Sequence, residues 1–248
     1  MANKPAVNYD GASDFAARGS DLTGSSASKQ ITVSTWFLRT TDGNVDVFLA
    51  SNSSSYDLRF TSSNYFQFSL EDNTGTVIAM FLSTTTFTAD STWHNLLVSV
   101  DLTDTGKRHI YVDGVSVSGS WTTYTNSTID FTTINHSVGA LSSGGFKAGI
   151  SLSQLWMDFG VYIDFSSESN RDKFYVSGKA PDLGADGSEP AGSSPILYAP
   201  NGDPSTSTDD GNEGTGGNYT MSGAVTDVTG PESYEEDLTG PIFLSHFI

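Results

Sequence analysis

Two of the four histidines, His94 and His109, lie close together in the sequence and could exchange protons near neutral pH. His94 opens the stretch HNLLVSVD, and His109 lies in the stretch RHIYVDG after the next turn. A catalytic histidine needs an acidic or serine partner, and neither histidine has one at a spacing that defines a catalytic motif. We therefore predict that both histidines are structural.

Carboxylates are the other candidates for chemistry, because glycoside hydrolysis uses a pair of them. Alternate residues of one strand point into the same cleft, so a pair two residues apart would be well placed. None of the seven glutamates lies in such a pattern on a predicted strand. Glu235 and Asp237 have this spacing but lie in an acidic linker. We predict that the protein is not an enzyme.

Several groups of acids could bind calcium, which needs several carboxylate and carbonyl oxygens as ligands. Asp10 and Asp14 in YDGASD are the first candidates. None of the groups forms a complete calcium loop, so turn formation and solvated acids are the alternative interpretation. The other candidate residues are Asp42, Asn44, Asp46, Asp209, Asp210 and Asn212.

The stretch GSWTTYTNS has the residue types that bind a sugar: an aromatic ring to stack on a pyranose and polar side chains around it. We predict a glycan site at Trp121, Tyr124 and Asn126. The alternative is that Trp121 folds back over the sandwich and packs against it.

The elements that position these residues are predicted to be strands, because hydrophobic and polar residues alternate in short runs between turns. In ITVSTWFLR, Ile31, Val33, Thr35 and Phe37 share one face. One helix is expected near 166–177, with a serine N-cap and with Gly178 at its C-terminal end. An acidic loop is expected near 201–217. The further predicted strands include 45–51, 56–62, 65–72, 75–84 and 94–101.

Composition excludes several classes of protein. The chain has 248 residues, no cysteine and a net charge of −18, and every Lys and Arg lies at or before Lys179. Such an acidic surface repels phosphate, so we expect no nucleic-acid partner. No apolar stretch approaches the roughly 20 residues that span a bilayer. The N-terminus lacks a basic region followed by an apolar run, so we expect no signal peptide and synthesis in a cytoplasm.

Residues 231–248 are predicted to be an acidic linker that ends in an apolar tip. A free apolar tip would promote aggregation, so we expect it to be buried. It could return to the sandwich as an edge strand, or dock on a like subunit or another partner, and we favour docking. The residues predicted to dock are Ile242, Phe243, Leu244, Phe247 and Ile248.

Four features occur in order along residues 7–165: VNYDGASDFAARG, ITVSTWF, TWHNLLVSVD with RHIYVDGVSV, and GISLSQLWMD. This pattern resembles the laminin-G-like branch of the concanavalin A-like lectin/glucanase sandwiches. The resemblance implies an all-β jelly roll of two antiparallel sheets in a domain of residues 1–230, a face that can hold sugar, and calcium as the usual ion. Where family members carry an acidic pair, this chain has Ser153–Gln154, which removes hydrogen-bond partners or ligands from such a site.

The later stretch, from YIDFSSESNRDKF to GTGGNYTMSGAVTD, is similar to a version of this family found in tailed phages and prophages. The resemblance implies a non-enzymatic component exposed on the virion, as a head decoration, a spike or a tail appendage. Its partners would be other virion proteins or like subunits in a homo-oligomer. The alternative is a lectin or carbohydrate-binding module that recognises host surface glycan, and a glucan hydrolase is a third possibility.

Overall fold

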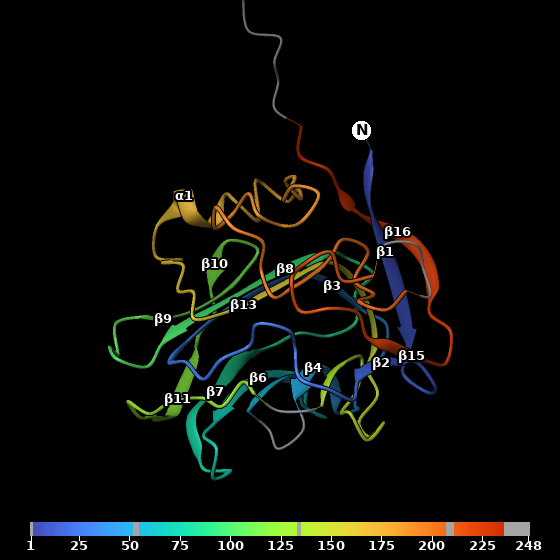
Figure 1. Ribbon diagram of the computed structural model, residues 1–248. Helices are drawn as coiled ribbons and strands as arrows, with labels where there is room; N and C mark the ends of the chain where they lie inside the picture. Colours follow the sequence, from blue (N-terminus) through green and yellow to red (C-terminus); the bar gives the residue numbers. More distant parts are fainter. Residues whose placement is uncertain (1, 52–54, 133–134, 207–210, 236–248) are drawn as a thin grey trace, which may run out of the picture.

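The computed structural model describes residues 2–51, 55–132, 135–206 and 211–235 of the protein. Its strands form two antiparallel sheets of eight strands each, stacked as two layers (Figure 1). The predicted all-β fold, a sandwich of two antiparallel sheets with one short helix, is confirmed.

The first sheet carries the strands that surround the candidate site. Its strand order is β10-β9-β8-β3-β13-β1-β16, and the short strand β14 pairs with one end of β13. The strands are β10 (Val115–Ser116), β9 (Arg108–Val112), β8 (His94–Asp101), β3 (Gln30–Arg39), β13 (Gly149–Phe159), β1 (Asn3–Asp10), β16 (Thr226–Glu232) and β14 (Leu197–Ala199).

The second sheet forms the opposite layer of the sandwich, with the order β11-β7-β6-β5-β4-β12-β2-β15. Its middle strands follow one another along the chain as hairpins, as the alternating segments and turns predict. The strands are β11 (Gly119–Tyr124), β7 (Val77–Thr86), β6 (Tyr65–Glu71), β5 (Tyr56–Phe60), β4 (Asp46–Ser51), β12 (His136–Val138), β2 (Phe15–Arg18) and β15 (Thr220–Ser222).

The main core fills the space between the two sheets. Alternation along β3 directs Ile31, Val33 and Phe37 into this space, where they meet Phe48 and Phe68 from the second sheet. All five side chains are at most 1% exposed. Burial of each such side chain stabilises the fold by roughly 1.5–3 kcal/mol.

The outer face of the first sheet is also buried, because the segment 160–200 lies across it (Figure 1). A second hydrophobic cluster forms there around Trp156 of β13, with Phe165 and Phe174 from the covering segment. The Trp156 indole N–H donates a hydrogen bond of 2.8 Å to the carbonyl of Gly187. The strands β8, β3 and β13 are therefore buried on both faces.

The helix α1 (Glu168–Arg171) is four residues long and shorter than the expected span of 166–177. Ser167 is its N-cap residue, but its side chain makes no capping hydrogen bond. After Arg171 the chain turns inward, because the ring of Phe174 packs 5.4 Å from that of Trp156 between centroids. Burial of this ring replaces further turns of helix.

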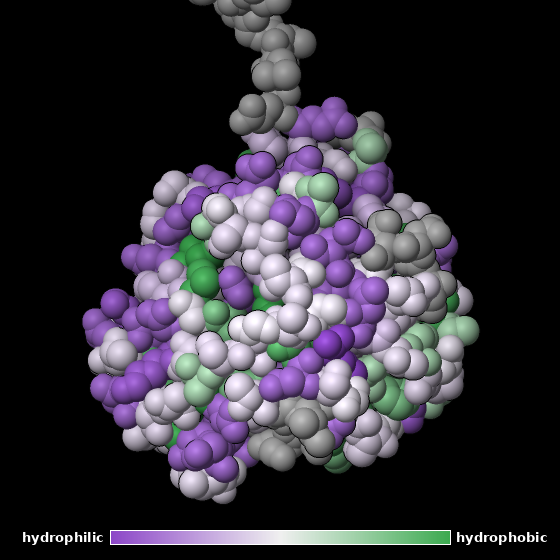
Figure 2. All heavy atoms as spheres, in the orientation of Figure 1, coloured by the Kyte–Doolittle hydropathy of each residue, from purple (hydrophilic) through white to green (hydrophobic). Residues whose placement is uncertain are grey.

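The C-terminal part of the described chain returns to the first sheet. β16 pairs with β1 and continues to Glu232, whose carbonyl accepts a hydrogen bond from the Ala180 N–H at 2.8 Å. The apolar tip at 241–248 lies outside the described residues. Figure 2 shows a face of the molecule that is mainly hydrophilic or intermediate in hydropathy. No helix among the described residues is long and apolar enough to cross a membrane.

Candidate functional site

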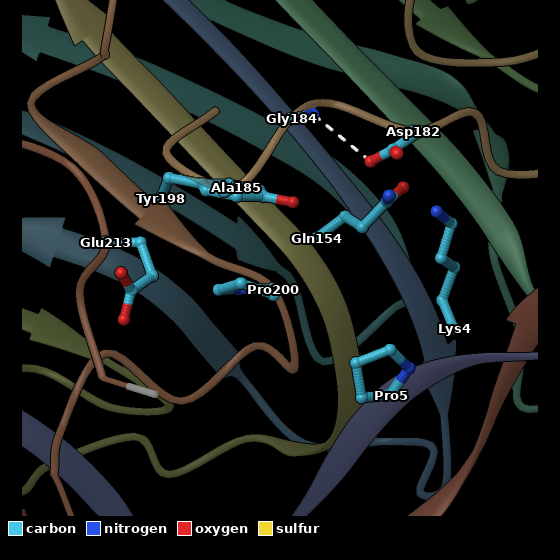
Figure 3. Close-up of a pocket in the computed structure, with 9 residues that line it drawn as sticks. All are labelled: Lys4, Pro5, Gln154, Asp182, Gly184, Ala185, Tyr198, Pro200 and Glu213. Carbon is cyan, nitrogen blue, oxygen red and sulfur yellow. Dashed lines mark hydrogen bonds between the residues drawn. The ribbon is translucent and has the colours of Figure 1, made fainter. Parts of the chain in front are cut away.

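A pocket of about 540 Å³ opens on the outer side of the first sheet, beside β13 and β1 (Figure 3). Three parts of the chain that are distant in sequence meet here: the start of β1, the middle of β13, and the loops before and after β14. The residues that line the pocket are Lys4, Pro5, Gln154, Asp182, Gly184, Ala185, Tyr198, Pro200 and Glu213.

Gln154 enters this pocket because β13 has a bulge at this point. The register between β13 and β3 shifts between Ser153 and Trp156, so Gln154 is not paired with a residue of β3. Its φ is +46°, in the left-handed region that side chains other than glycine rarely adopt. The bulge and this backbone conformation together direct the Gln154 side chain away from the β3 ladder.

The Gln154 side chain is buried and only partly satisfied. Its Nε2 donates a hydrogen bond of 2.7 Å to the Pro181 carbonyl, and its backbone N–H donates one of 2.9 Å to the Pro200 carbonyl. Gln154 is 2% exposed, yet its Oε1 has no hydrogen-bond partner among the described residues. A buried acceptor without a donor costs about 1–3 kcal/mol, so this oxygen favours a ligand that supplies a hydroxyl or N–H.

Charged side chains lie at both ends of the pocket. Figure 3 shows the ends of Lys4 and Asp182 close to Gln154, with Glu213 at the opposite end. Asp182 accepts a hydrogen bond of 3.1 Å from the Gly184 N–H, which positions its carboxylate. Lys4 forms no ion pair with another described residue. The pocket therefore offers one cationic donor and two carboxylate acceptors around an amide.

Apolar surfaces separate these polar groups. Pro5, Ala185 and Pro200 line the pocket between its two charged ends, and Tyr198 lies behind them, 4% exposed. Such a mixture of small apolar faces with several donors and acceptors matches a ligand that has C–H faces and a rim of hydroxyls.

The predicted glycan residues Trp121 and Tyr124 lie elsewhere, on the edge strand β11. The half-buried Trp121 ring packs 5.3 Å from that of Phe81, and the Arg108 guanidinium lies 5.6 Å from its centre. The Tyr124 hydroxyl donates a hydrogen bond of 2.9 Å to the Asp101 carbonyl. Trp121 and Tyr124 thus cover the edge of the main core while keeping part of their surface exposed.

Asn126 lies in a second, more polar cleft of about 520 Å³. Its Oδ1 accepts a hydrogen bond of 2.7 Å from Lys29 Nζ. The structure therefore brings Asn126 together with charged residues, while Trp121 and Tyr124 do not line this cleft. A glycan role for the three residues stays a prediction. The cleft is lined by Ala27, Lys29, Asp72, Asn73, Asn126, Ser127, Thr128, Asp130 and Thr132.

The carboxylates of the first calcium candidates, Asp10 and Asp14, accept backbone hydrogen bonds. Asp10 Oδ1 accepts the N–H groups of Ala12 and Ser13, both at 2.7 Å. Burial would raise the pKa of the Asp10 carboxyl, but these N–H groups, with that of Asp14 and the Ser13 hydroxyl, lower the pKa to about 2. Asp14 Oδ1 accepts the N–H of Ala224 at 3.0 Å.

The other calcium candidates form ion pairs, accept hydrogen bonds, are exposed, or lie outside the residues that the structure describes. Asp46 pairs with Arg39 at 2.6 Å, and Asp42 lies 3.5 Å from the same guanidinium. Asn212 Oδ1 accepts the N–H of Tyr198 at 2.9 Å. Asn44 is exposed, and residues 209–210 are not described. In the described part of the chain, no group of three or more His, Cys, Asp or Glu is arranged to hold a metal ion.

Both histidines have acidic neighbours that the sequence did not indicate. His94 lies 2.6 Å from Asp113 and 3.1 Å from Asp90. The hydrogen bond to Asp113 is the main reason that the pKa of His94 rises to about 9. His109 lies 2.7 Å from the Tyr162 hydroxyl and 3.3 Å from Asp164, and burial lowers its pKa. Neither histidine lines the pocket around Gln154.

Lys4, Gln154 and Asp182 were missed as candidate site residues. The sequence did contain one indication of Gln154. This chain has Ser153–Gln154 at the position where the family that it resembles carries an acidic pair. The structure places this departure at the pocket. No pattern in the sequence links Lys4 or Asp182 to Gln154, because they meet only through the folded chain.

A family model described as the concanavalin A-like lectin/glucanases superfamily matches residues 10–157. No curated protein sequence matches the chain. The solved structure of a candidate carbohydrate-binding protein from Bacteroides ovatus ATCC 8483 is similar, with a TM-score of 0.60 and 14% identity. The similarity covers 94% of this chain, and the chain spans 62% of the length of that protein.

A second similar structure is the native heptameric SAP-like pentraxin from Limulus polyphemus, with a TM-score of 0.54 and 12% identity. The similarity covers 92% of this chain and 96% of the pentraxin. At these identities the two structures show a shared sandwich fold.

Proposed function

Because the chain belongs to the concanavalin A-like lectin/glucanases superfamily, we propose that it is a non-enzymatic glycan-binding protein whose site is the pocket around Gln154. The unpartnered, buried Oε1 of Gln154 is the observation that carries this proposal. The name of the similar Bacteroides ovatus protein, a candidate for carbohydrate binding, supports the same class of ligand.

The pocket matches a neutral sugar in size and in polar groups. Its volume of about 540 Å³ falls within the range of ligand sites, about 300–1,000 Å³. One sugar hydroxyl would donate to Gln154 Oε1, and a second would donate to the Asp182 carboxylate. Lys4 would donate to a hydroxyl or ring oxygen, and Pro5 and Pro200 would contact the C–H face.

A glycan array followed by calorimetric titration of the best ligand tests the proposal. Lys4→Ala and Asp182→Ala each remove one polar wall without touching the core, so we expect each to weaken binding about tenfold, about 1.4 kcal/mol. Lys29→Ala is the matched control, because Lys29 lies in the separate cleft beside Asn126. Unchanged affinity in both pocket variants would remove the site from this pocket.

The earlier prediction of a glycan site at Trp121, Tyr124 and Asn126 is tested by the same titration. Trp121→Ala and Asn126→Ala alter the edge strand and the polar cleft while the pocket around Gln154 stays complete. Loss of binding in these variants, with normal binding in Lys4→Ala, would move the glycan site to that edge. Release of reducing sugar from β-glucans would contradict the non-enzymatic part of the proposal.

A second proposal concerns the setting in which the protein works. The resemblance of residues 162–227 to sequences of tailed phages favours a component exposed on a virion, where a glycan site would contact the host surface. Association with like subunits or other virion proteins belongs to this proposal. Mass spectrometry of purified phage particles from a host that carries the gene tests it, and absence of the protein from intact particles would refute it.

A further inference from the structure

A row of side chains continues from the pocket along the outer face of the first sheet. Asn95 of β8, Trp36 of β3 and Ser153 of β13 lie directly opposite one another across three neighbouring strands. Gln154 follows Ser153 at the bulge and lines the pocket. The floor of the pocket therefore continues sideways toward β8, beneath the covering segment.

This row is rich in buried polar atoms that lack partners. The indole Nε1 of Trp36, both amide atoms of Asn95 and the Oε1 of Gln154 form no hydrogen bond with any described residue. The three side chains are 1%, 0% and 2% exposed. Each buried polar atom without a partner costs about 1–3 kcal/mol, so one row contains an unusual concentration of unfavourable groups.

The ring of Tyr175 covers Trp36. The two rings stack with their centroids 5.7 Å apart and an angle of 29° between planes. On its other side the Tyr175 ring meets the turn after β9, because a Cβ on Gly114 would lie only 3.2 Å from it. Asn95 borders this turn, since its backbone N–H donates to Asp113 Oδ1 at 2.8 Å. Tyr175 thus fills a slot between the Trp36 indole and the turn that follows β9.

Next to this ring, residues 176–179 form a turn that is closed by its own backbone hydrogen bonds. Val176 and Lys179 donate backbone hydrogen bonds to each other, both at 3.0 Å, so this turn depends little on the sheet beneath it. Ser177 has a φ of +49°, which a serine rarely adopts. The ion pair between Lys179 and Glu232, at 3.4 Å, is partly exposed and therefore weak.

The two ends of this segment are held more firmly. The Tyr175 N–H donates a hydrogen bond of 2.9 Å to the Arg171 carbonyl. At the other end, Gln154 Nε2 binds the Pro181 carbonyl. The segment can therefore move as a strap between fixed ends, and one end is attached to the residue that lines the pocket.

We propose that the slot under Tyr175 is a second sugar subsite, which opens when the Tyr175 ring swings out. A hexopyranose would then stack on the Trp36 ring in place of the Tyr175 ring and bond to the Asn95 amide. A linked unit would occupy the pocket at Gln154. This inference rests on the proposed function and specifies its ligand as a glycan of at least two linked hexopyranose units.

Tyr175→Ala in the full-length chain tests the subsite, because it removes the ring that competes with the sugar. The probes are maltose, cellobiose and lactose, with glucose and galactose as single-unit probes, each titrated by calorimetry. We expect affinity for at least one disaccharide to rise about fivefold or more, while affinity for the monosaccharides changes less than twofold. Adding Asn95→Ala should abolish this gain. Tyr162→Ala, which alters another half-buried tyrosine of the cover, is the matched control.

A second measurement uses the unaltered protein. Trp36→Phe identifies the Trp36 indole N–H resonance among the four tryptophans, and we expect a disaccharide to shift this resonance while its component monosaccharide does not. Disaccharide binding without this shift, and without a gain in Tyr175→Ala, would overturn the subsite and leave the pocket intact. Absence of binding to every probe and to the glycan array would overturn the proposed function as well.

Discussion

The two faces of the first sheet differ sharply in how they are buried. The inner face meets the second sheet through apolar side chains such as Val33, Phe37 and Val98. The outer face is equally hidden, yet Trp36 and Asn95 there hold polar atoms without partners in the described chain. On the same strands, the inner side is therefore buried by apolar contacts, whereas the outer side also buries polar atoms that have no partner among the described residues.

This difference indicates that the inner face stabilises the fold and that the outer face binds a ligand. A packed apolar layer between sheets gives stability and a single strand register. Buried polar atoms without partners lower stability, and natural proteins retain such groups mainly where function requires them. We therefore expect substitutions on the inner face to act on stability, and substitutions in the outer row to act mainly on binding.

Phe37→Ala is the largest test of the inner face. Phe37 is 1% exposed and packs 5.3 Å from the ring of Phe60, so its loss leaves a cavity between the sheets. We expect the free energy of unfolding to fall by about 3–5 kcal/mol, measured by urea denaturation. A loss below about 1 kcal/mol would show that the two faces do not differ in this way.

Asp158→Asn should have an intermediate effect, in the stabilising direction. Burial raises the pKa of Asp158 to about 6, so the folded state favours the protonated carboxyl. The contribution of the protonated Asp158 carboxyl to the free energy of unfolding is therefore fully present below pH ~4. This contribution is lost as the pH rises through about 6. At pH 7.5 we therefore expect Asp158→Asn to melt a few degrees above the unaltered protein. The gain should shrink toward pH 4, and a gain that is equal at both pH values would contradict this cause.

His94→Gln tests the edge of the inner face, where His94 lies opposite Phe37, and should have a smaller effect. Because the folded pKa of about 9 exceeds the ordinary value of 6.5, the stability from His94 is complete below pH 6.5 and is lost as the pH rises toward 9. The group is half-buried, so we expect about 0.5–1 kcal/mol at pH 6 and no difference above pH 9. A deficit that grows with rising pH would contradict the ion pairs with Asp90 and Asp113. Retained glycan binding in this variant would agree with a structural role.

Trp36→Phe should have the smallest effect on stability. The substitution loses some packed area, but it also removes an indole N–H that has no partner among the described residues. These opposite terms should leave the free energy of unfolding within roughly 0.5 kcal/mol of the original value. A loss of several kcal/mol would mean that the indole contributes to stability as the inner-face residues do.

Local patterns in the sequence predicted the sandwich but overestimated the helix. Alternation in 31–37 and in 94–101 correctly placed strands, because a half-buried strand leaves a period of two in its hydrophobic residues. The helix expected at 166–177 ended at Arg171, because burial of Phe174 against Trp156 competes with continued helical turns. Capping and stop signals in the sequence depend only on neighbouring residues. They therefore do not predict that tertiary packing of Phe174 ends the helix early.

The sequence by itself determined that the chain is all-β, acidic and without cysteine, and its ordered motifs indicated the superfamily. Only the tertiary structure decided which polar residues form a site. Lys4 and Gln154 are 150 positions apart, and Tyr175 reaches Trp36 across 139 positions. Strand periodicity fixes the face on which a side chain lies. The partners of that side chain depend on long-range pairing and on the covering segment, which local patterns do not encode.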